Sequence, residues 1–222
     1  VQNGETITVL RDIATNVEIK EKDNVKVTID GNGMKMTGTI KVVALSSDND
    51  RRITIKNFKF EDTTSASVDF ITSVETNHYP RLTVEGCTFT GSGDATDVAL
   101  RLKSSKNVEI KNCTGKGLHS FLQNTSGWNL TIEGVTVTES KSAFALGTVQ
   151  GVTIKGSTID VATYGIRLDA NTYNNNAVIE SNTVKAFIPV VVRKANAESN
   201  ITVEIPGINE ADKIITKTIR KL

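Results

Sequence analysis

The chain has 222 residues, of which 26 are Lys or Arg and 25 are Asp or Glu, so its formal net charge is +1. This balance excludes a nucleic-acid or membrane-surface binder that depends on a large basic excess. A hydrophobic content of 38% excludes a disordered chain, and the apolar runs are too short to span a bilayer. Thr, Val and Ile together make up about a third of the residues, which is typical of β-proteins.

A repeat with a period of about 25 residues runs through the chain. Each unit opens with an eight-residue segment, and these segments are residues 27–34, 53–60, 82–89, 108–115, 130–137, 152–159, 177–184 and 201–208. In most units the first and third positions are apolar and the second and fourth are polar, the alternation of a strand with one buried face. The fifth position is usually Gly or Asn, which predicts a sharp bend with positive φ, and a second short strand follows it.

A third strand fits into the rest of each unit. The candidate segments are residues 40–45, 68–71, 98–103, 120–123, 143–146, 165–168 and 189–193. Three strands in the same order, with no helical period between them, favour a coil that stacks on the next coil and forms three parallel sheets around a narrow core. An antiparallel sandwich or barrel is the alternative, but it requires hairpin turns at a shorter spacing than this period.

The V-T-I-[KE]-[GN]-x-T-[FVI] repeat resembles the right-handed parallel β-helix of the pectin-lyase-like superfamily. The opening GETITVLRDIATNVEIKEKDNVKVTIDGNG resembles the first coils of secreted bacterial β-helix domains. The resemblance implies an all-β helix of eight or nine coils over residues 1–208 and an extracellular or cell-surface location in a bacterium. That superfamily contains lyases, hydrolases, adhesins and inert spacers, so the resemblance leaves the function open.

The segment after the last repeat has a different pattern. Residues 209–222 place apolar side chains on one helical face, with Asn209 as a helix N-cap. Because a bare coil edge would pair with another chain, we expect this segment to cap the stack, as a short helix or, alternatively, as a strand.

Stacking places equivalent repeat positions one above another, so each position forms a column. The fourth positions alternate in charge from one coil to the next, in the order Asp30, Lys56, Glu85, Lys111, Glu133, Lys155, Glu180 and Glu204, with Glu204 ending the alternation. This pattern predicts a ladder of opposite charges that fixes the register, with a charged binding face as the alternative. Threonine columns at the second and seventh positions suit exposed strands, and ice binding is the alternative reading.

Two cysteines, Cys87 and Cys113, occupy the sixth position of adjacent units. We predict two buried, reduced thiols, with a disulfide between neighbouring coils as the alternative. No Cys-x-x-Cys motif or Cys/His cluster indicates a metal site, and nothing in the sequence indicates a cofactor.

Enzymes of the pectin-lyase-like superfamily that hydrolyse galacturonan share Asn-x-Asp, Asp-Asp, Gly-His-Gly and Arg-x-Lys motifs. This sequence has neither Asp-Asp nor Gly-His-Gly. The remaining catalytic candidates are Asp69, Arg101 and Asp169 on the third strands, with Arg167 as a glycan-binding candidate. The other interpretation of these charges is a solvated strand face with incidental ion pairs. Asp69 and Arg101 should lie on neighbouring coils, whereas Arg167 should lie three coils from Arg101, roughly 14 Å away. Further charged residues are expected nearby, namely Asp94, Asp97 and Arg193.

Three aromatic residues, Tyr79, Trp128 and Tyr173, precede first strands, and we expect them in loops on one side of the stack. Their rings could stack on sugar faces, or fold back over the side of the helix.

The sequence therefore predicts a secreted or cell-surface module that binds polysaccharide or host glycan, adheres, or acts as a scaffold. The alternative is a polysaccharide lyase or glycoside hydrolase that acts on the outer face of one sheet. We expect no cofactor, no nucleic-acid partner and no membrane insertion.

Overall fold

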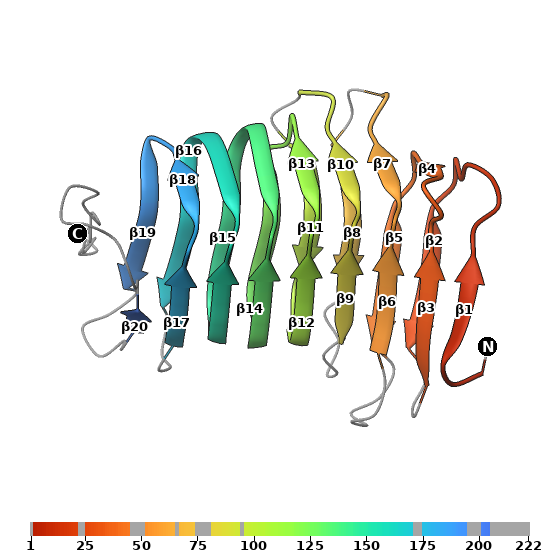
Figure 1. Cartoon of the computed structure of the whole chain (residues 1–222), viewed down its shortest axis with the longest axis horizontal. Helices are drawn as coiled ribbons and strands as arrows, with labels where there is room; N and C mark the ends of the chain where they lie inside the picture. The colour runs from red at the N-terminus through yellow and green to blue at the C-terminus, as the bar shows by residue number, and fades with distance from the viewer. Residues whose placement is uncertain are drawn as a thin grey trace.

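The computed structural model is a stack of parallel β-coils, drawn side by side along the long axis of the molecule in Figure 1. It describes residues 2–21, 25–44, 52–64, 67–73, 81–93, 96–170, 175–194 and 201–204. Every strand pairing among these residues is parallel, as the repeat predicts. For example, Ile53 of β6 (Arg52–Lys56) lies beside Leu82 of β9 (Leu82–Glu85). The antiparallel alternative is therefore wrong.

The first strands of the coils form the first sheet. It contains β1 (Glu5–Thr8), β3 (Lys26–Asp30), β6, β9, β12 (Ser105–Lys111), β17 (Asn175–Glu180), β20 (Ile201–Glu204) and the C-terminal parts of β14 (Ser120–Glu133) and β15 (Thr136–Lys155).

The second and third strands form two further sheets. The second sheet contains β4 (Lys35–Met36), β7 (Lys59–Glu61), β10 (Thr88–Thr90), β13 (Thr114–Lys116), β18 (Thr183–Lys185) and the N-terminal parts of β15 and β16 (Thr158–Ala170). The third sheet contains β2 (Val17–Glu21), β5 (Ile40–Ala44), β8 (Asp69–Ser73), β11 (Val98–Leu102), β19 (Ile188–Lys194), the start of β14, the middle of β15 and the end of β16.

Within the part of the chain that the structure describes, seven coils have a strand in all three sheets, fewer than the eight or nine that the repeat predicts. The difference arises at the ends of the stack. Before β3, the second sheet receives only an isolated bridge between Ile13 and Met36. After β19, β20 is the only strand among the described residues. The predicted cap at residues 209–222 lies outside the described residues.

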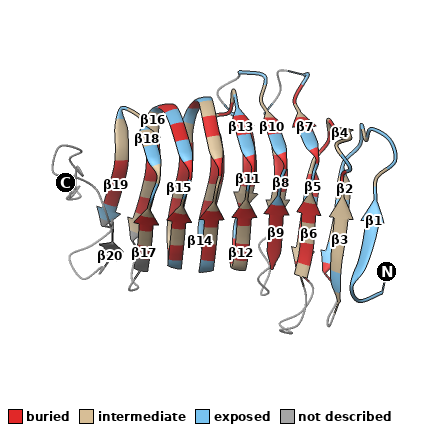
Figure 2. Ribbon diagram, viewed as in Figure 1, coloured by how far each residue is buried: buried red, intermediate tan, exposed pale blue. Residues whose placement is uncertain are grey.

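The core follows the repeat. The third positions form one continuous column in the first sheet, as predicted, and Figure 2 shows the alternation of buried and less buried residues along these strands. Its members are Ile29, Ile55, Val84, Ile110, Ile132, Ile154 and Ile179. All except Ile29 are buried.

Aromatic rings from the second sheet, from the third sheet and from the bend before β7 cluster inside the stack. Phe60 stacks on Phe89 of the next coil, with the ring centroids 4.9 Å apart, and Phe58 and Phe70 lie within 5.9 Å of Phe60. All four rings are buried. Such rings bury large apolar areas, so this cluster is a main source of stability in the N-terminal half.

The bend after the first strand has the predicted left-handed backbone in six units, at Asn57, Gly86, Asn112, Gly134, Gly156 and Ser181. Gly31 differs, since the positive φ angles fall on Asn32 and Gly33 instead. A Cβ atom on Gly31 would lie 2.5 Å from the ring of Phe58. Glycine is therefore required there for space.

The fourth positions form the predicted charge ladder on the outside of the first sheet, with opposite charges adjacent in six successive strand pairs. Lys155 Nζ, for example, lies 3.1 Å from Glu133 Oε1. The prediction is wrong for Glu204, because a two-residue shift places it beside Val178 rather than Glu180.

We expect Lys155→Glu to destabilise the fold modestly, because it would place three glutamates in successive coils. The pairs are partly exposed, so the free energy of unfolding should fall by about 1 kcal/mol at low salt. This loss should shrink in about 1 M salt, which screens such charges. Urea denaturation at both salt concentrations measures it, with Lys155→Gln as the control that removes charge without reversing it. An equal loss at both concentrations would contradict the electrostatic explanation.

No helix among the described residues is long and apolar enough to span a membrane.

Candidate functional site

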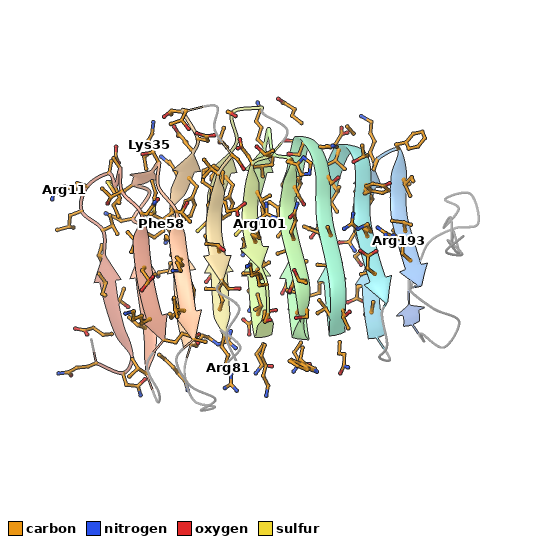
Figure 3. All side chains as sticks on the ribbon, turned by 180° about the vertical axis from the view of Figure 1, so that it is seen from behind. Arg11, Lys35, Phe58, Arg81, Arg101 and Arg193 are labelled. Carbon is orange, nitrogen blue, oxygen red and sulfur yellow. The ribbon has the colours of Figure 1, made fainter. Side chains whose placement is uncertain are left out.

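The outer face of the third sheet contains the charged residues singled out in the sequence. One outward column consists of Arg101, Gln123, Ala145 and Arg167 in successive coils. Arg101 therefore lies three coils from Arg167, as predicted. Figure 3 labels Arg101 in the middle of the stack and Arg193 toward its C-terminal end.

The first cluster on this face joins three coils. Arg101 Nε lies 2.6 Å from Asp69 Oδ2 in the preceding coil, and a second N–H of Arg101 donates to Gln123 Oε1 in the following coil. The prediction that Asp69 and Arg101 lie on neighbouring coils is confirmed. Both side chains are about one-third exposed, at 36% for Arg101 and 31% for Asp69. The guanidinium is thus held in a fixed orientation with one face of the cluster open to solvent.

The second cluster lies four coils from Asp69. Two arginines lie within ion-pair distance of the Asp169 carboxylate, namely Arg167, with its Nε 3.3 Å from Oδ2, and Arg193 of the next coil, with its Nε 3.3 Å from Oδ1. Asp169 is the least exposed of the three side chains. Asp69 and Asp169 are therefore each paired with arginine.

The two carboxylates cannot act together on one bond. Four coil steps separate the strand of Asp69 from the strand of Asp169, which corresponds to roughly 19 Å at about 4.8 Å per step. The carboxyl pairs of glycosidases are about 5–9.5 Å apart. Asp69 and Asp169 therefore belong to separate clusters. No group of three or more His, Cys, Asp or Glu side chains within the described ranges is arranged to hold a metal ion.

Asp97 does not lie on the outer face as expected, because its side chain is completely buried. Its Oδ2 accepts hydrogen bonds from Ser92 N at 2.7 Å and Ser92 Oγ at 3.1 Å, and its Oδ1 accepts one from Val68 N at 3.3 Å. These donors hold the carboxylate inside, where it joins the segment after β10 to the residue before β8 in the preceding coil. Asp94 lies outside the described residues.

Trp128 does not lie in a loop, contrary to the sequence prediction. It belongs to β14, which is hydrogen-bonded on both edges, and it lies between Lys106 of β12 and Gln150 of β15. This two-sided pairing keeps Ser126–Gly127–Trp128–Asn129 extended despite its turn-like composition. The Trp128 side chain is 37% exposed. Tyr79 and Tyr173 lie outside the described residues.

The sequence analysis did not single out Gln123, which lies beside Arg101, or Lys106, which lies beside Trp128. Gln123 occupies the same outward repeat position as Arg101. Lys106 precedes the repeat unit at 108–115 by two residues, as Trp128 precedes the next unit. Reading complete columns, rather than charged residues alone, would have found both.

The two cysteines are free and buried, as predicted. Cys87 Sγ donates to the carbonyl oxygens of Glu85 and Ile55. The adjacent Cys113 thiol and burial raise the pKa of Cys87 well above its usual value. An inward, protonated thiol is a poor nucleophile.

We expect the thiols of the native protein to resist a water-soluble disulfide reagent such as DTNB, because neither sulfur is accessible. Two thiols should react once denaturant is added, since the chain has two cysteines. Absorbance of the released thiolate gives both counts. No reaction in denaturant without reductant would reveal a disulfide and contradict the structure.

Comparison with known proteins gives one family and one distant structure. A search of curated proteins gives no significant match. Among solved structures, endopolygalacturonase I from Stereum purpureum, complexed with two galacturonates, matches with a TM-score of 0.40 and 13% identity over 98% of this chain and 94% of that chain. This likeness is too low to bear on function. The family model described as "Right handed beta helix region" matches residues 42–204. This is more than half of the chain, and the protein belongs to the right-handed β-helix family.

Proposed function

We propose that the protein is a secreted or cell-surface module that binds glycan without cleaving it, through the outer face of the third sheet. The observation that carries the proposal is the pair of arginine clusters on this face. Arg101 and Arg167 share one outward column, three coils apart, with only Gln123 and Ala145 between them. The strip between the arginines thus consists of one amide and one methyl group.

The chemistry of these clusters suits sugar recognition. A guanidinium has five N–H donors in a rigid plane, which can reach hydroxyl or carboxylate oxygens in pairs. Asp69 accepts a hydrogen bond from one N–H of Arg101, and Asp169 forms an ion pair with Arg167. Because hydrogen bonds to Asp69 and Gln123 already orient Arg101, its binding to a ligand costs little side-chain entropy.

The separation of Asp69 and Asp169 supports binding over hydrolysis, since an acid and a base must reach the same glycosidic bond. The location rests on the resemblance of the first coils to secreted bacterial β-helix domains. A rigid stack of parallel coils also suits an adhesive or structural role at a cell surface.

A glycan array tests the proposal with Arg101→Gln, Arg167→Gln and the double variant. We expect wild-type protein to bind a subset of acidic or neutral polysaccharides, and the double variant to bind them about tenfold or more weakly. Lys59→Gln is the matched control, because Lys59 is an exposed cation on the second sheet. Circular dichroism verifies that each variant is folded.

Two outcomes would contradict the proposal. One is undiminished binding of every glycan by the folded double variant. The other is the appearance of unsaturated products or new reducing ends that disappears in Asp69→Asn or Asp169→Asn, which would favour the lyase or hydrolase alternative.

A further inference from the structure

One corner of the helix differs between the middle and the ends of the stack. In the middle, β14 and β15 pass from the third sheet to the first sheet as continuous strands, and only two residues separate β11 from β12. In the coils on either side, residues 45–51, 74–81 and 171–174 separate the third strand from the next first strand. Figure 1 shows β12, β14 and β15 side by side at this corner.

Polar side chains, some of them buried, fix the backbone of this tight corner. Asn124 Nδ2 donates to Ser105 Oγ at 2.9 Å, and Ser126 Oγ donates to Lys103 O at 3.2 Å in the preceding coil. A Cβ atom on Gly127 would lie 2.4 Å from Ser105 O, so glycine is needed for the close approach of β14 to β12. The backbone next to Trp128 is therefore fixed between β12 and β15.

Three side chains on this fixed backbone form what we name the Trp128 corner, namely Lys106, Trp128 and Gln150, which are adjacent in register. Trp128 is 37% exposed in the middle of the row. Beside it, Asn129 Nδ2 donates to Asn107 Oδ1 at 2.8 Å, which adds an amide ladder along the same edge. The corner thus combines an aromatic face, an ammonium group and amides.

Lys106 adds an anion preference. Many lysines on the outer faces are paired with carboxylates, for example Lys56 with Asp30 and Lys111 with Glu109. Within the described ranges, no carboxylate lies within ion-pair distance of Lys106. An ammonium group beside an exposed indole can pair with an anion on a ring that stacks on that indole.

We propose that the Trp128 corner is a second binding site, which takes one pyranose ring of an anionic glycan. The apolar face of the ring stacks on Trp128, its carboxylate or sulfate pairs with Lys106, and its hydroxyls bond the Gln150 amide. The proposal shares with the proposed function only the premise that the ligand is a glycan. Lys106, Trp128 and Gln150 lie where their strands enter the first sheet, whereas Arg101 and Arg167 lie on the third sheet.

Intrinsic fluorescence reports on this corner alone, because Trp128 is the single tryptophan of the chain. The full chain is titrated with alginate, which has carboxylates, with dextran sulfate, and with neutral dextran. We expect a saturable blue shift of the Trp128 emission with at least one anionic polymer and none with dextran. A stronger response to alginate would identify the anion as a carboxylate, and a stronger response to dextran sulfate would identify it as a sulfate.

Calorimetry on variants gives the second measurement. Trp128→Ala should weaken binding of the responding polymer about tenfold, and Lys106→Gln about threefold with a weaker dependence on salt. Trp128→Phe should restore most of the affinity, which a merely structural role of Trp128 would not require. Lys59→Gln should bind as the wild type does.

The outcomes separate this site from the arginine face. Binding that leaves the Trp128 emission and the affinity of Trp128→Ala unchanged, but is lost in the Arg101/Arg167 double variant, would overturn the corner and support the proposed function. A fluorescence response that survives in the folded double variant would support the corner. No binding of any polymer by any form would overturn both.

Discussion

Phe60→Ala should lower the free energy of unfolding by about 3–5 kcal/mol, the usual cost of deleting a buried aromatic ring. Phe60 is completely buried, stacks on Phe89 at 4.9 Å and also contacts Phe58 and Phe70. Neighbouring rings cannot collapse into the space, because each is fixed in its own coil. Chemical denaturation followed by circular dichroism measures the loss.

The control for Phe60→Ala is Phe187→Ala, since the Phe187 side chain is 83% exposed. Its stability should change by less than about 0.5 kcal/mol. Equal losses in the two variants would show that the aromatic cluster does not form the core that the structure describes.

Asp97→Ala should lower the free energy of unfolding by about 3 kcal/mol. Asp97 is fully buried, and its carboxylate accepts hydrogen bonds from Ser92 N, Ser92 Oγ and Val68 N. The substitution removes this acceptor and breaks the three hydrogen bonds. Asp97→Asn should cost less, because one amide oxygen remains to accept a hydrogen bond. Thermal and urea denaturation of both variants tests the ranking.

Asp160→Ala is the matched control for Asp97→Ala. Asp160 pairs with Lys185 at 2.9 Å, but its side chain is 52% exposed, and such surface pairs contribute about 0–1 kcal/mol. If Asp97→Ala were no more destabilising than Asp160→Ala, the hydrogen-bonded interior position of Asp97 would be wrong.

The period of the repeat was sufficient to predict the parallel coils and the inner column from Ile29 to Ile179. A fixed period stacks like on like, and the strand alternation decides which residues face inward. The same logic placed Asp69 beside Arg101. It gave too many coils, because incomplete coils at the ends keep the sequence pattern without all three strands.

The errors at single residues arose from long-range pairing. The composition around Trp128 indicates a loop, but hydrogen bonds to β12 and β15 impose a strand. Asp97 is polar and follows a short turn, which indicates a surface position, but donors from Ser92 and Val68 satisfy its carboxylate inside. Ser92 is only five residues from Asp97, but Val68 and the strand partners of Trp128 are more than twenty residues away, too far to be read from the local sequence.

We expect the outer face of the third sheet to bind glycan without cleaving it. The most direct measurement incubates the purified protein with the polysaccharides that it binds, and follows retention and product formation in the same samples. The account predicts saturable binding that depends on Arg101 and Arg167, with no new reducing ends and no absorbance from unsaturated sugars. Steady product formation by wild-type protein that is abolished in the folded Asp69→Asn variant would contradict it.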